Sequence, residues 1–347
     1  MLKKQTAYSI LDLAILSKGS SLAQTFKNTI ELAQEADKLN YKRYWLAEHH
    51  NSEAIGSSAT TVLIGKVADN TSCIRVGSGG VMLPNHSPLI VAEQFGTLGT
   101  LYPNRIDLGL GRAPGTDQAT ARAIRSDFFQ AAQSFPTEVE KIQNYFSKSN
   151  ASSKVRANVA EGVDVPLYIL GSSTDSAHLA SRKGLPYAFA SHFATTHLFN
   201  ALQIYRDQFK ASDVLAKPYT IAGVNVIVAD SDEEAEQIST SMYRMIFSLL
   251  TGHPTYLQEP TAMTSELRAM AQHPSVHQML KYSFIGSKAT VKTKISEFLK
   301  QTEVDEIIVA TNIYSIEDRI KSYKLFSEIM NELNVESVGT KGTITNL

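Results

Sequence analysis

Short apolar segments rich in β-branched residues alternate with longer amphipathic segments along the whole chain. Eight segments have the length and composition of strands, at residues 6–14, 42–48, 74–83, 105–111, 166–171, 186–191, 219–229 and 305–311. Each is followed by a segment whose apolar residues recur at helical spacing. This order predicts an α/β fold, a TIM-type (β/α)8 barrel, with an open doubly wound sheet as the alternative.

Two stretches exceed the simple repeat of strand and helix. They span about residues 113–164, after the fourth strand, and about 251–304, after the seventh. Long strand-to-helix insertions of such barrels lie at the C-terminal face and often act as lids. No linker rich in Gly and Ser interrupts the pattern, so we expect one domain over residues 1–347, with a C-terminal tail over about 335–347.

The charge balance narrows the classes of partner. The chain has 33 Lys and Arg against 34 Asp and Glu, a formal net charge of -1, which gives no electrostatic reason to bind nucleic acid or a membrane surface. Asp12 interrupts the apolar stretch near the N-terminus, and no run is long enough to cross a membrane. The one cysteine, Cys73, excludes an internal disulfide and a zinc site built on several thiolates. We therefore expect a cytoplasmic protein.

The residues that end the strands deserve most weight, because the active site of such a barrel lies there. The second strand ends in Glu48, His49 and His50. Successive strand residues face opposite ways, so only one of the two histidines can point into the barrel mouth, and the adjacent pair is a poor pair of metal ligands. A catalytic or cofactor-contacting histidine is the favoured interpretation, with a capping role as the alternative and no metal site predicted. Strand alternation alone does not decide between His49 and His50.

Two more strand ends carry unusual residues. Gly79 and Gly80 crowd the end of the third strand, where they indicate close approach of a flat ligand or a bulge before Pro84. Arg112 follows the fourth strand in a loop of small residues, where a guanidinium can bind a phosphate in bidentate fashion or form a surface ion pair.

The fifth strand runs into a helix through a loop rich in hydroxyl groups. Gly171, Ser172, Ser173 and Ser176 lie at this junction. Free backbone amides at a helix N-terminus favour an anion, so the loop predicts a phosphate site. The same hydroxyl groups could simply cap the helix.

These motifs, in this order, resemble the bacterial luciferase-like flavin monooxygenase family. The matching segments are YWLAEHHNSEAIGSSAT, IRVGSGGVMLPNHSPLIVAEQFGTL, RIDLGLGRAPGT and PLYILGSSTDSAHLASRKGLPYAFASHF, which cover most of residues 1–200. The resemblance implies a TIM-type barrel that holds flavin mononucleotide (FMN) at its C-terminal mouth. It makes His49 the active-site histidine and matches Gly79 and Gly80 to a small-residue pair, often joined by a cis peptide, beside the flavin ring. The implied contacts of the FMN phosphate are Arg112, Ser172, Ser173 and Ser176.

The chain departs from the light-emitting members of that family. They have a reactive cysteine immediately before the arginine, where this chain has Gly111, and a glutamate in the phosphate loop, where it has Ser172. We therefore do not predict light emission. The resemblance is to single-chain members with a similar SHFA segment, so Ser191 and His192 are expected to line the flavin or substrate pocket together with Asp12, unless Asp12 anchors a neighbouring loop.

The activity implied is that of a flavin-dependent monooxygenase, in which reduced FMN and dioxygen oxidise a small organic substrate. Electrons would come from NAD(P)H or a separate flavin reductase, and a homodimer is expected by resemblance. The alternatives are a deazaflavin-dependent oxidoreductase of the same fold, a flavin-binding protein without catalysis and a metal-dependent hydrolase. Five residues are expected to form apolar walls that exclude water, namely Leu46, Val81, Met82, Leu110 and Phe189.

Overall fold

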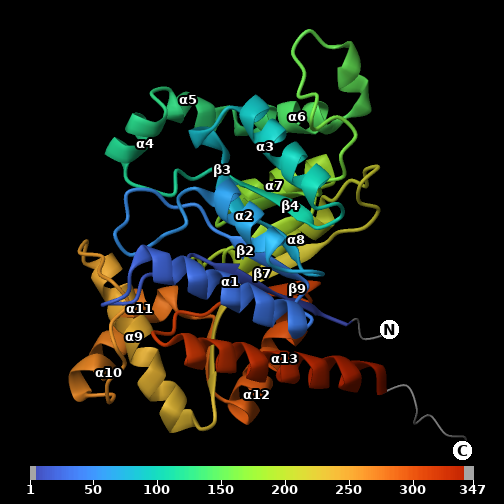
Figure 1. Cartoon of the computed structure of the whole chain (residues 1–347). Coiled ribbons are helices and arrows are strands. Elements are labelled where there is room, and N and C mark those ends of the chain that lie inside the picture. The colour runs from blue at the N-terminus through green and yellow to red at the C-terminus, as the bar shows by residue number, and fades with distance from the viewer. Residues whose placement is uncertain (1–4, 340–347) are drawn as a thin grey trace, which may run out of the picture.

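The computed structural model describes residues 5–339 and has a closed barrel of parallel strands at its centre, surrounded by helices (Figure 1). The barrel strands are β1 (Ala7–Asp12), β2 (Arg43–Leu46), β3 (Arg75–Met82), β4 (Ile106–Gly111), β5 (Leu167–Gly171), β6 (Tyr187–Phe189), β7 (Thr220–Ala229) and β9 (Glu306–Ala310). Each strand pairs in parallel with the next, and β9 closes the ring between β7 and β1. All eight predicted strands are present, and the predicted TIM-type barrel is confirmed.

Helices follow the strands as the amphipathic segments predicted. The helices outside the two insertions are α1 (Leu22–Lys38), α2 (Thr60–Asp69), α3 (Pro88–Leu101), α7 (Thr174–Lys183), α8 (Leu198–Asp207), α9 (Asp232–Leu250) and α13 (Ile316–Gly339), with a short 3-10 turn η1 (Leu83–Asn85) before α3. Residues 335–339 of the expected tail belong to α13, and the rest of that tail lies outside the described residues. Within residues 5–339, no helix is long and apolar enough to cross a membrane.

The two predicted insertions are present after β4 and β7. The first holds α4 (Gln118–Ile124), α5 (Phe128–Gln133), α6 (Phe135–Phe146) and the 3-10 segment η2 (Lys148–Ser152), and the second holds α10 (Ser265–Gln272), α11 (Pro274–Met279), β8 (Ser283–Ser287) and α12 (Lys288–Thr302). In Figure 1 the first insertion lies at the top of the view, while α10 and α12 lie toward the bottom and α11 lies at the left, just below the level of α1.

Strand β8 was not predicted. The ten residues of β7 are long enough for three neighbours, because residues 220–222 pair with β6, residues 221–225 pair with β9 and residues 225–229 pair with β8. The second half of β7 therefore extends beyond the barrel and carries β8 as a ninth strand. Only five residues long and set inside an irregular insertion, β8 has too little alternation to be recognised.

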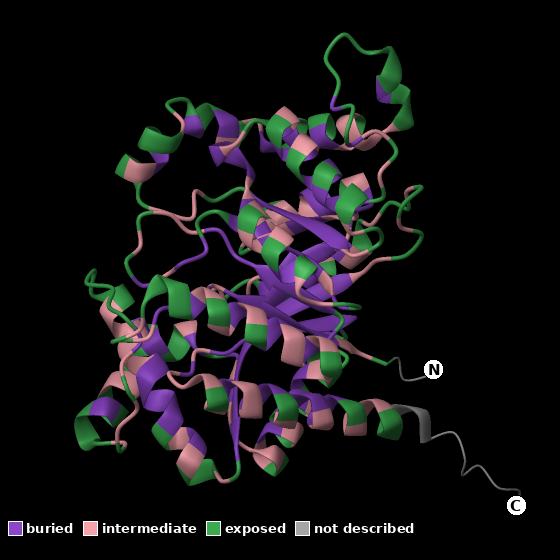
Figure 2. Cartoon of the chain, viewed as in Figure 1, coloured by how far each residue is buried: buried purple, intermediate pink, exposed green. Residues whose placement is uncertain are grey.

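Apolar side chains form two separate layers on the two faces of the barrel. A large cluster between the strands and the helices includes Ile10 of β1, Tyr44 of β2 and Leu32 of α1. A smaller cluster fills the inside and includes Leu11 and Trp45. The strands are almost entirely buried in Figure 2, as expected for parallel strands covered on both faces.

The prediction of apolar walls was wrong for four of its five residues. The large outer cluster contains Leu46, Val81, Leu110 and Phe189, which therefore pack under the helices. Because successive residues alternate between faces, the inner wall takes their neighbours instead. It consists of Leu11, Trp45, Ala47, Tyr168, Ala188, Ile221 and Ile308, with Leu13, Leu170 and Tyr219 partly buried beside them.

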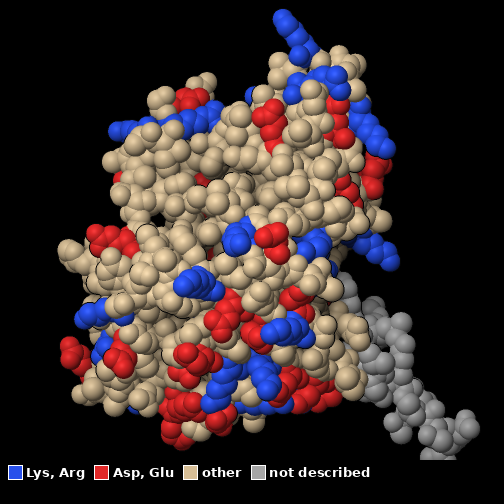
Figure 3. Space-filling model, viewed as in Figure 1, with Lys and Arg blue, Asp and Glu red and all other residues tan. Residues whose placement is uncertain are grey.

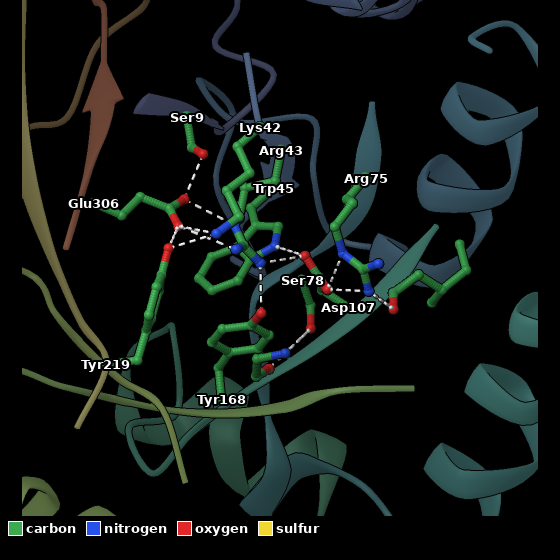
Figure 4. A network of polar contacts seen from close by, with 12 residues as sticks. Ser9, Lys42, Arg43, Trp45, Arg75, Ser78, Asp107, Tyr168, Tyr219 and Glu306 are labelled. Carbon is green, nitrogen blue, oxygen red and sulfur yellow. Dashed lines mark hydrogen bonds and ion pairs between the residues drawn. The ribbon is translucent and has the colours of Figure 1, made fainter. Parts of the chain in front are cut away.

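A network of charged residues crosses the inside of the barrel near the N-terminal ends of the strands (Figure 4). Arg43 of β2 is 1% exposed and contacts Asp107 of β4 at 2.6 Å and Glu306 of β9 at 2.7 Å. Its guanidinium also donates to the hydroxyl group of Tyr168 on β5, and Ser9 of β1 donates to Glu306. Burial alone would raise the pKa of Glu306, but the positive charges of Arg43 and Lys42 and the hydrogen bonds from Ser9 and Tyr219 together hold that pKa below its usual range.

The first and last described elements meet on one side of the barrel. The backbone N–H of Thr6 donates to Oδ1 of Asn334 at 2.9 Å, and Nδ2 of Asn334 donates to the carbonyl oxygen of Thr6 at 3.0 Å. Since β1 pairs directly with β9, the strand before α13 is also the neighbour of the first strand.

Candidate functional site

His49 and His50 follow β2 and take different directions. Arg43 and Trp45 face the inside of the barrel, and the alternation of the chain continues through Ala47 of the inner cluster to His49. The Nδ1 atom of His49 is buried and has no hydrogen-bond partner among residues 5–339. Burial lowers the pKa of His49 against the opposing charge of Glu48, so the ring is neutral at pH 7. The ring of His50 instead contacts Glu48 at 2.8 Å.

Four side chains from two loops meet at Glu48, and we call Glu48, His50, Asn85 and His86 the Glu48 cluster. Oε1 of Glu48 accepts hydrogen bonds from His50 Nε2 at 2.8 Å, His86 Nε2 at 2.8 Å and Asn85 Nδ2 at 3.1 Å. Its other oxygen accepts from the backbone N–H of Met82 at 3.1 Å. Burial alone would raise the pKa of Glu48, but the hydrogen bonds from His50, His86 and Asn85, together with the charge of His86, lower it to about 2.

The Glu48 cluster also holds the loop that follows β4. The backbone N–H of His50 donates to the carbonyl oxygen of Gly115 at 3.2 Å, and Asn85 Nδ2 donates to that of Pro114 at 2.9 Å. Gly115 has a φ of 64° and packs so closely that an added Cβ would lie 2.5 Å from the carbonyl oxygen of Glu48. The cluster thus fixes the backbone at Pro114 and Gly115, two and three residues after the predicted phosphate-binding Arg112.

In the described part of the chain, His192 is the second histidine whose Nδ1 atom is buried without a partner. It follows β6 and is held against β7, because Asn225 Nδ2 donates to its carbonyl oxygen at 2.7 Å and Ser191 Oγ donates to the carbonyl oxygen of Gly223 at 2.6 Å. Burial and the nearby charge of His49 lower the pKa of His192 to about 4. The two rings lie after β2 and β6, near enough for the charge of His49 to affect the pKa of His192.

The ring of His192 packs directly against the backbone of Gly223, where a side chain would block it. An added Cβ at Gly223 would lie 2.5 Å from Nδ1 of His192, closer than atoms of this kind can approach. Ser191, predicted to line the pocket, is fully buried and its hydroxyl group is bound to Gly223.

Gly79 and Gly80 are joined by a cis peptide bond in β3. The pairing of β3 with β4 shifts its register between Ser78 and Val81, so the glycines form the irregularity that the sequence indicated. An added Cβ at Gly79 would lie 2.7 Å from Leu11 Cδ1, which places Gly79 beside the inner cluster.

The predicted phosphate-binding residues lie together at the ends of β4 and β5. Nη2 of Arg112 is 3.2 Å from Oδ2 of Asp175 in the first turn of α7, and both side chains are more than half exposed. Ser173 is the N-cap of α7 but makes no side-chain capping hydrogen bond, so the amides of the first turn lack that internal partner. Ser172 is exposed beside it.

Ser176 and Gly171 have a different local role. The hydroxyl group of Ser176 donates to the carbonyl oxygen of Ser173 at 3.0 Å and lies 3.1 Å from the hydroxyl oxygen of Tyr187. It passes so close to Gly171 that an added Cβ there would lie 1.6 Å from Oγ. Gly171 thus allows Ser176 to tie the loop to β6.

Asp12 does not lie with these residues. It is fully buried on the outer face of β1, where Arg319 of α13 donates to Oδ1 at 2.8 Å and Tyr44 and Thr29 donate to Oδ2 at 2.6 and 2.9 Å. The backbone N–H of Ala14 also donates to Oδ1 at 3.0 Å. Asp12 therefore anchors the loop after β1 to α1 and α13, which was the alternative to a pocket role.

Comparison with known proteins agrees with this arrangement. Residues 7–306 match the sequence profile of the family described as luciferase-like monooxygenase. The chain belongs to the luciferase-like monooxygenase family. A luciferase-like monooxygenase of Escherichia coli strain K12 is 45% identical over 333 residues, which cover 96% of this chain and 99% of that protein. The N-acetyl-S-alkylcysteine monooxygenase of Bacillus subtilis strain 168 is 29% identical, over 92% of this chain and 97% of that protein.

Solved structures of luciferase-like and related proteins share the fold. The structure of apo-MsnO8 is similar with a TM-score of 0.86 and 30% identity, over 94% of this chain and 98% of that chain. The oxygenating constituent of 3,6-diketocamphane monooxygenase from Pseudomonas putida, in complex with FMN, has a TM-score of 0.69 and 17% identity, over 93% and 97% of the two chains. At that identity the likeness shows the fold alone.

Three residues of this luciferase-like site were not predicted. Asn85 and His86 lie in the segment PNHSP after β3, where the only signal was a histidine close to a strand end. Gly223 lies inside β7, where an isolated glycine among apolar residues is a sign of close approach.

Proposed function

We propose that this chain is an FMN-dependent monooxygenase that oxidises a small organic substrate. The observation that carries the proposal is the arrangement of Arg112 and the uncapped start of α7 at the same barrel end as the inward-facing ring of His49. An anionic group and a reacting group can thus be bound at one end of the barrel. Its parallel in a solved structure is the diketocamphane monooxygenase subunit in complex with FMN.

The residues fit a flavin in two respects. Arg112 and the amides of α7 suit the FMN phosphate, since a guanidinium and a helix N-terminus both favour an anion. The buried Nδ1 atoms of His49 and His192 lack partners among the described residues, and a group bound in the mouth would complete their hydrogen bonding. We propose Ser172 and Ser173 as further phosphate contacts, and Gly79 and Gly80 as the surface beside the flavin ring.

Reduced FMN would supply two electrons to dioxygen, so that one oxygen atom enters the substrate and the other leaves as water. His49 is neutral at pH 7 and can donate a proton from one ring nitrogen and accept one at the other. The inner apolar cluster, with Trp45 and Ala47 below His49, keeps water from the lower side of the site. Either NAD(P)H or a separate flavin reductase would reduce the flavin.

The test is reconstitution of the full chain with FMN, followed by chemical reduction and exposure to dioxygen. N-acetyl-S-alkylcysteine is a suitable first probe, because a relative is named for its oxidation. We expect one oxygenated product for each dioxygen consumed. Release of hydrogen peroxide with no oxygenated product from a panel of thioethers, aldehydes and ketones would contradict monooxygenation. Tight binding of the deazaflavin F420 in place of FMN would contradict the cofactor.

We further propose that the chain forms a homodimer in the cytoplasm. Large apolar side chains are exposed on α2 and α3, with Val62 at 69%, Leu101 at 63% and Ile90 at 47%. Figure 3 shows few charged side chains over α3 compared with the lower half of the molecule. A second copy would bury this face. Sedimentation of the wild type and of Val62→Arg tests the homodimer, with a dimer expected for the wild type and a monomer for the variant.

Cell fractionation tests the proposed cytoplasmic location.

A further inference from the structure

The Glu48 cluster has more hydrogen-bond donors than its carboxylate oxygen can use well. Oε1 of Glu48 is the acceptor for His50, His86 and Asn85 at once. A carboxylate oxygen offers two lone-pair positions, so three N–H groups crowd one atom. Two of these groups belong to imidazole rings, which can also present a lone pair at the same nitrogen when the proton moves to Nδ1.

The same geometry suits a metal cation. Oε1 of Glu48 and the Nε2 atoms of His50 and His86 all lie within 4.8 Å of one another, and both Nε2 atoms lie 2.8 Å from that oxygen. The side chains of His50 and His86 are 21% and 32% exposed. Unlike the Nδ1 atoms of His49 and His192, their Nδ1 atoms are not among the buried unpaired atoms of the described residues. Each ring can therefore carry its proton on Nδ1 and offer Nε2 as a ligand. Only Asn85 would then donate to Oε1, which removes the crowding.

We propose that Glu48, His50 and His86 bind one divalent transition-metal ion of the Zn²⁺ type. Two imidazole nitrogens and one carboxylate oxygen, with a water molecule in the open position, are a known ligand set for Zn²⁺. The Met82 N–H and the Asn85 amide hold the carboxylate in place on its other sides, as the neighbours of metal ligands usually do. Glu48 and His50 come from the loop after β2 and His86 from the segment after η1, so the site does not use the adjacent histidines as a pair.

The ion would join the segments that frame one side of the barrel mouth. Glu48 and His50 follow β2, and His86 follows η1. His50 and Asn85 also bind the loop of Pro114 and Gly115 that begins at Arg112. Bound metal would therefore stabilise this loop, and it does so independently of flavin.

Metal binding is measured on the tag-free full chain after removal of bound metals. Co²⁺ replaces Zn²⁺ as the optical probe, and metal analysis after dialysis against Zn²⁺ gives the stoichiometry. We expect one ion per chain, the visible absorption of four-coordinate Co²⁺ and a higher melting temperature with Zn²⁺. His50→Gln and His86→Gln keep an N–H donor for Glu48, and each should weaken binding by at least about tenfold. His178→Gln, at an exposed histidine of α7 bound to Gln208, is the matched control and should bind as the wild type does.

A third variant identifies the ligand and guards against misfolding. His86→Cys supplies a thiolate in place of an imidazole, so the Co²⁺ complex should gain a sulfur-to-metal charge-transfer band. That band supports the proposal even if the glutamine variants fail to fold, and its absence overturns it. The proposal is equally overturned if the wild type binds no stoichiometric Co²⁺, or if binding survives in both glutamine variants and is lost in His49→Gln.

Discussion

His49 and His50 are neighbours in the chain, yet their rings make contacts in different regions. His49 continues the inner face of β2 beyond its end, near enough to His192 to affect its pKa, and its Nδ1 atom has no partner in the described structure. His50 turns to Glu48 and, through its backbone, to the loop after β4. A motif that looks like one functional unit in sequence is thus divided between two sites.

We expect His49→Ala to lower turnover by about 100-fold or more, because a positioned general acid or base contributes that much. FMN affinity should change little, since the proposed phosphate contacts are Arg112 and the start of α7. The measurements are steady-state turnover and a flavin fluorescence titration. His178→Ala, on the exposed face of α7, is the control. A larger loss of turnover in His50→Ala than in His49→Ala would reverse the assignment.

Arg112→Ala should weaken FMN binding by about 1.5–3 kcal/mol, the range for hydrogen bonds to charged groups. This equals roughly a tenfold to hundredfold rise in the dissociation constant. The exposed pair with Asp175 contributes little to stability, so the fold should be retained. Arg156→Ala, which breaks an exposed pair with Glu161 elsewhere, should leave the affinity unchanged. Equal affinities for the Arg112 variant and the wild type would exclude a phosphate contact there.

Gly223→Ala should displace the ring of His192, because the new Cβ would lie 2.5 Å from its Nδ1 atom. Crowding of this kind costs about 1–3 kcal/mol of stability. We expect lower turnover in a protein that still folds. Gly65→Ala is the matched control, since its Cβ would meet Leu98 at an ordinary 3.4 Å, and alanine favours the helix by about 1 kcal/mol. Urea unfolding and turnover are measured on both, and equal turnover would show that His192 has no role.

Arg43→Met should reduce the free energy of unfolding by about 3–5 kcal/mol, because it leaves Asp107 and Glu306 buried without their main partner. The control is Lys292→Met in a partly exposed pair with Glu332, where a change of at most about 1 kcal/mol is expected. Urea unfolding followed by circular dichroism compares the two. Similar losses in both variants would mean that the network at the base of the barrel adds no more than a surface pair.

The free energy of unfolding should decrease as the pH falls, because His192 is buried in its neutral form. Burial and the nearby charge of His49 lower its pKa from 6.5 to about 4, so between these values the unfolded chain binds a proton that the folded chain does not. The contribution is complete above pH 6.5 and is lost as the pH falls toward 4. His192→Gln should flatten the stability curve in this window, by up to about 1.4 kcal/mol per pH unit. His178→Gln should follow the wild-type curve, and a parallel curve for His192→Gln would contradict the assignment.

The sequence predicted the barrel because its strands alternate regularly with helices, and that pattern is local. It also located Arg112 and the start of α7, since residues that follow parallel strands gather at one end of a barrel. It did not locate the partners of Glu48, because His86 reaches it only through the packing of separate loops. The position of Asp12 was equally out of reach, since Arg319 lies 307 residues away in the chain.

The prediction of which residues form the apolar walls was wrong for a different reason. Leu46 and Phe189 were chosen for their apolar character near strand ends, without regard to which face they occupy. Trp45 and Ala188, one residue earlier in each strand, line the inner face. Hydrophobicity identifies a strand that is buried on both sides, but only the alternation of its residues tells the inner face from the outer one.

Two hydrogen bonds between Thr6 and Asn334 join the first and last parts of the described chain. The ring of strands has no first member, because β1 pairs in parallel with β9 just as every other barrel strand pairs with the strand before it. A gene rearranged so that α13 precedes β1 would encode every strand pairing of the present barrel. The strand pairings of the barrel therefore depend on the cyclic order of the strands and not on which strand comes first.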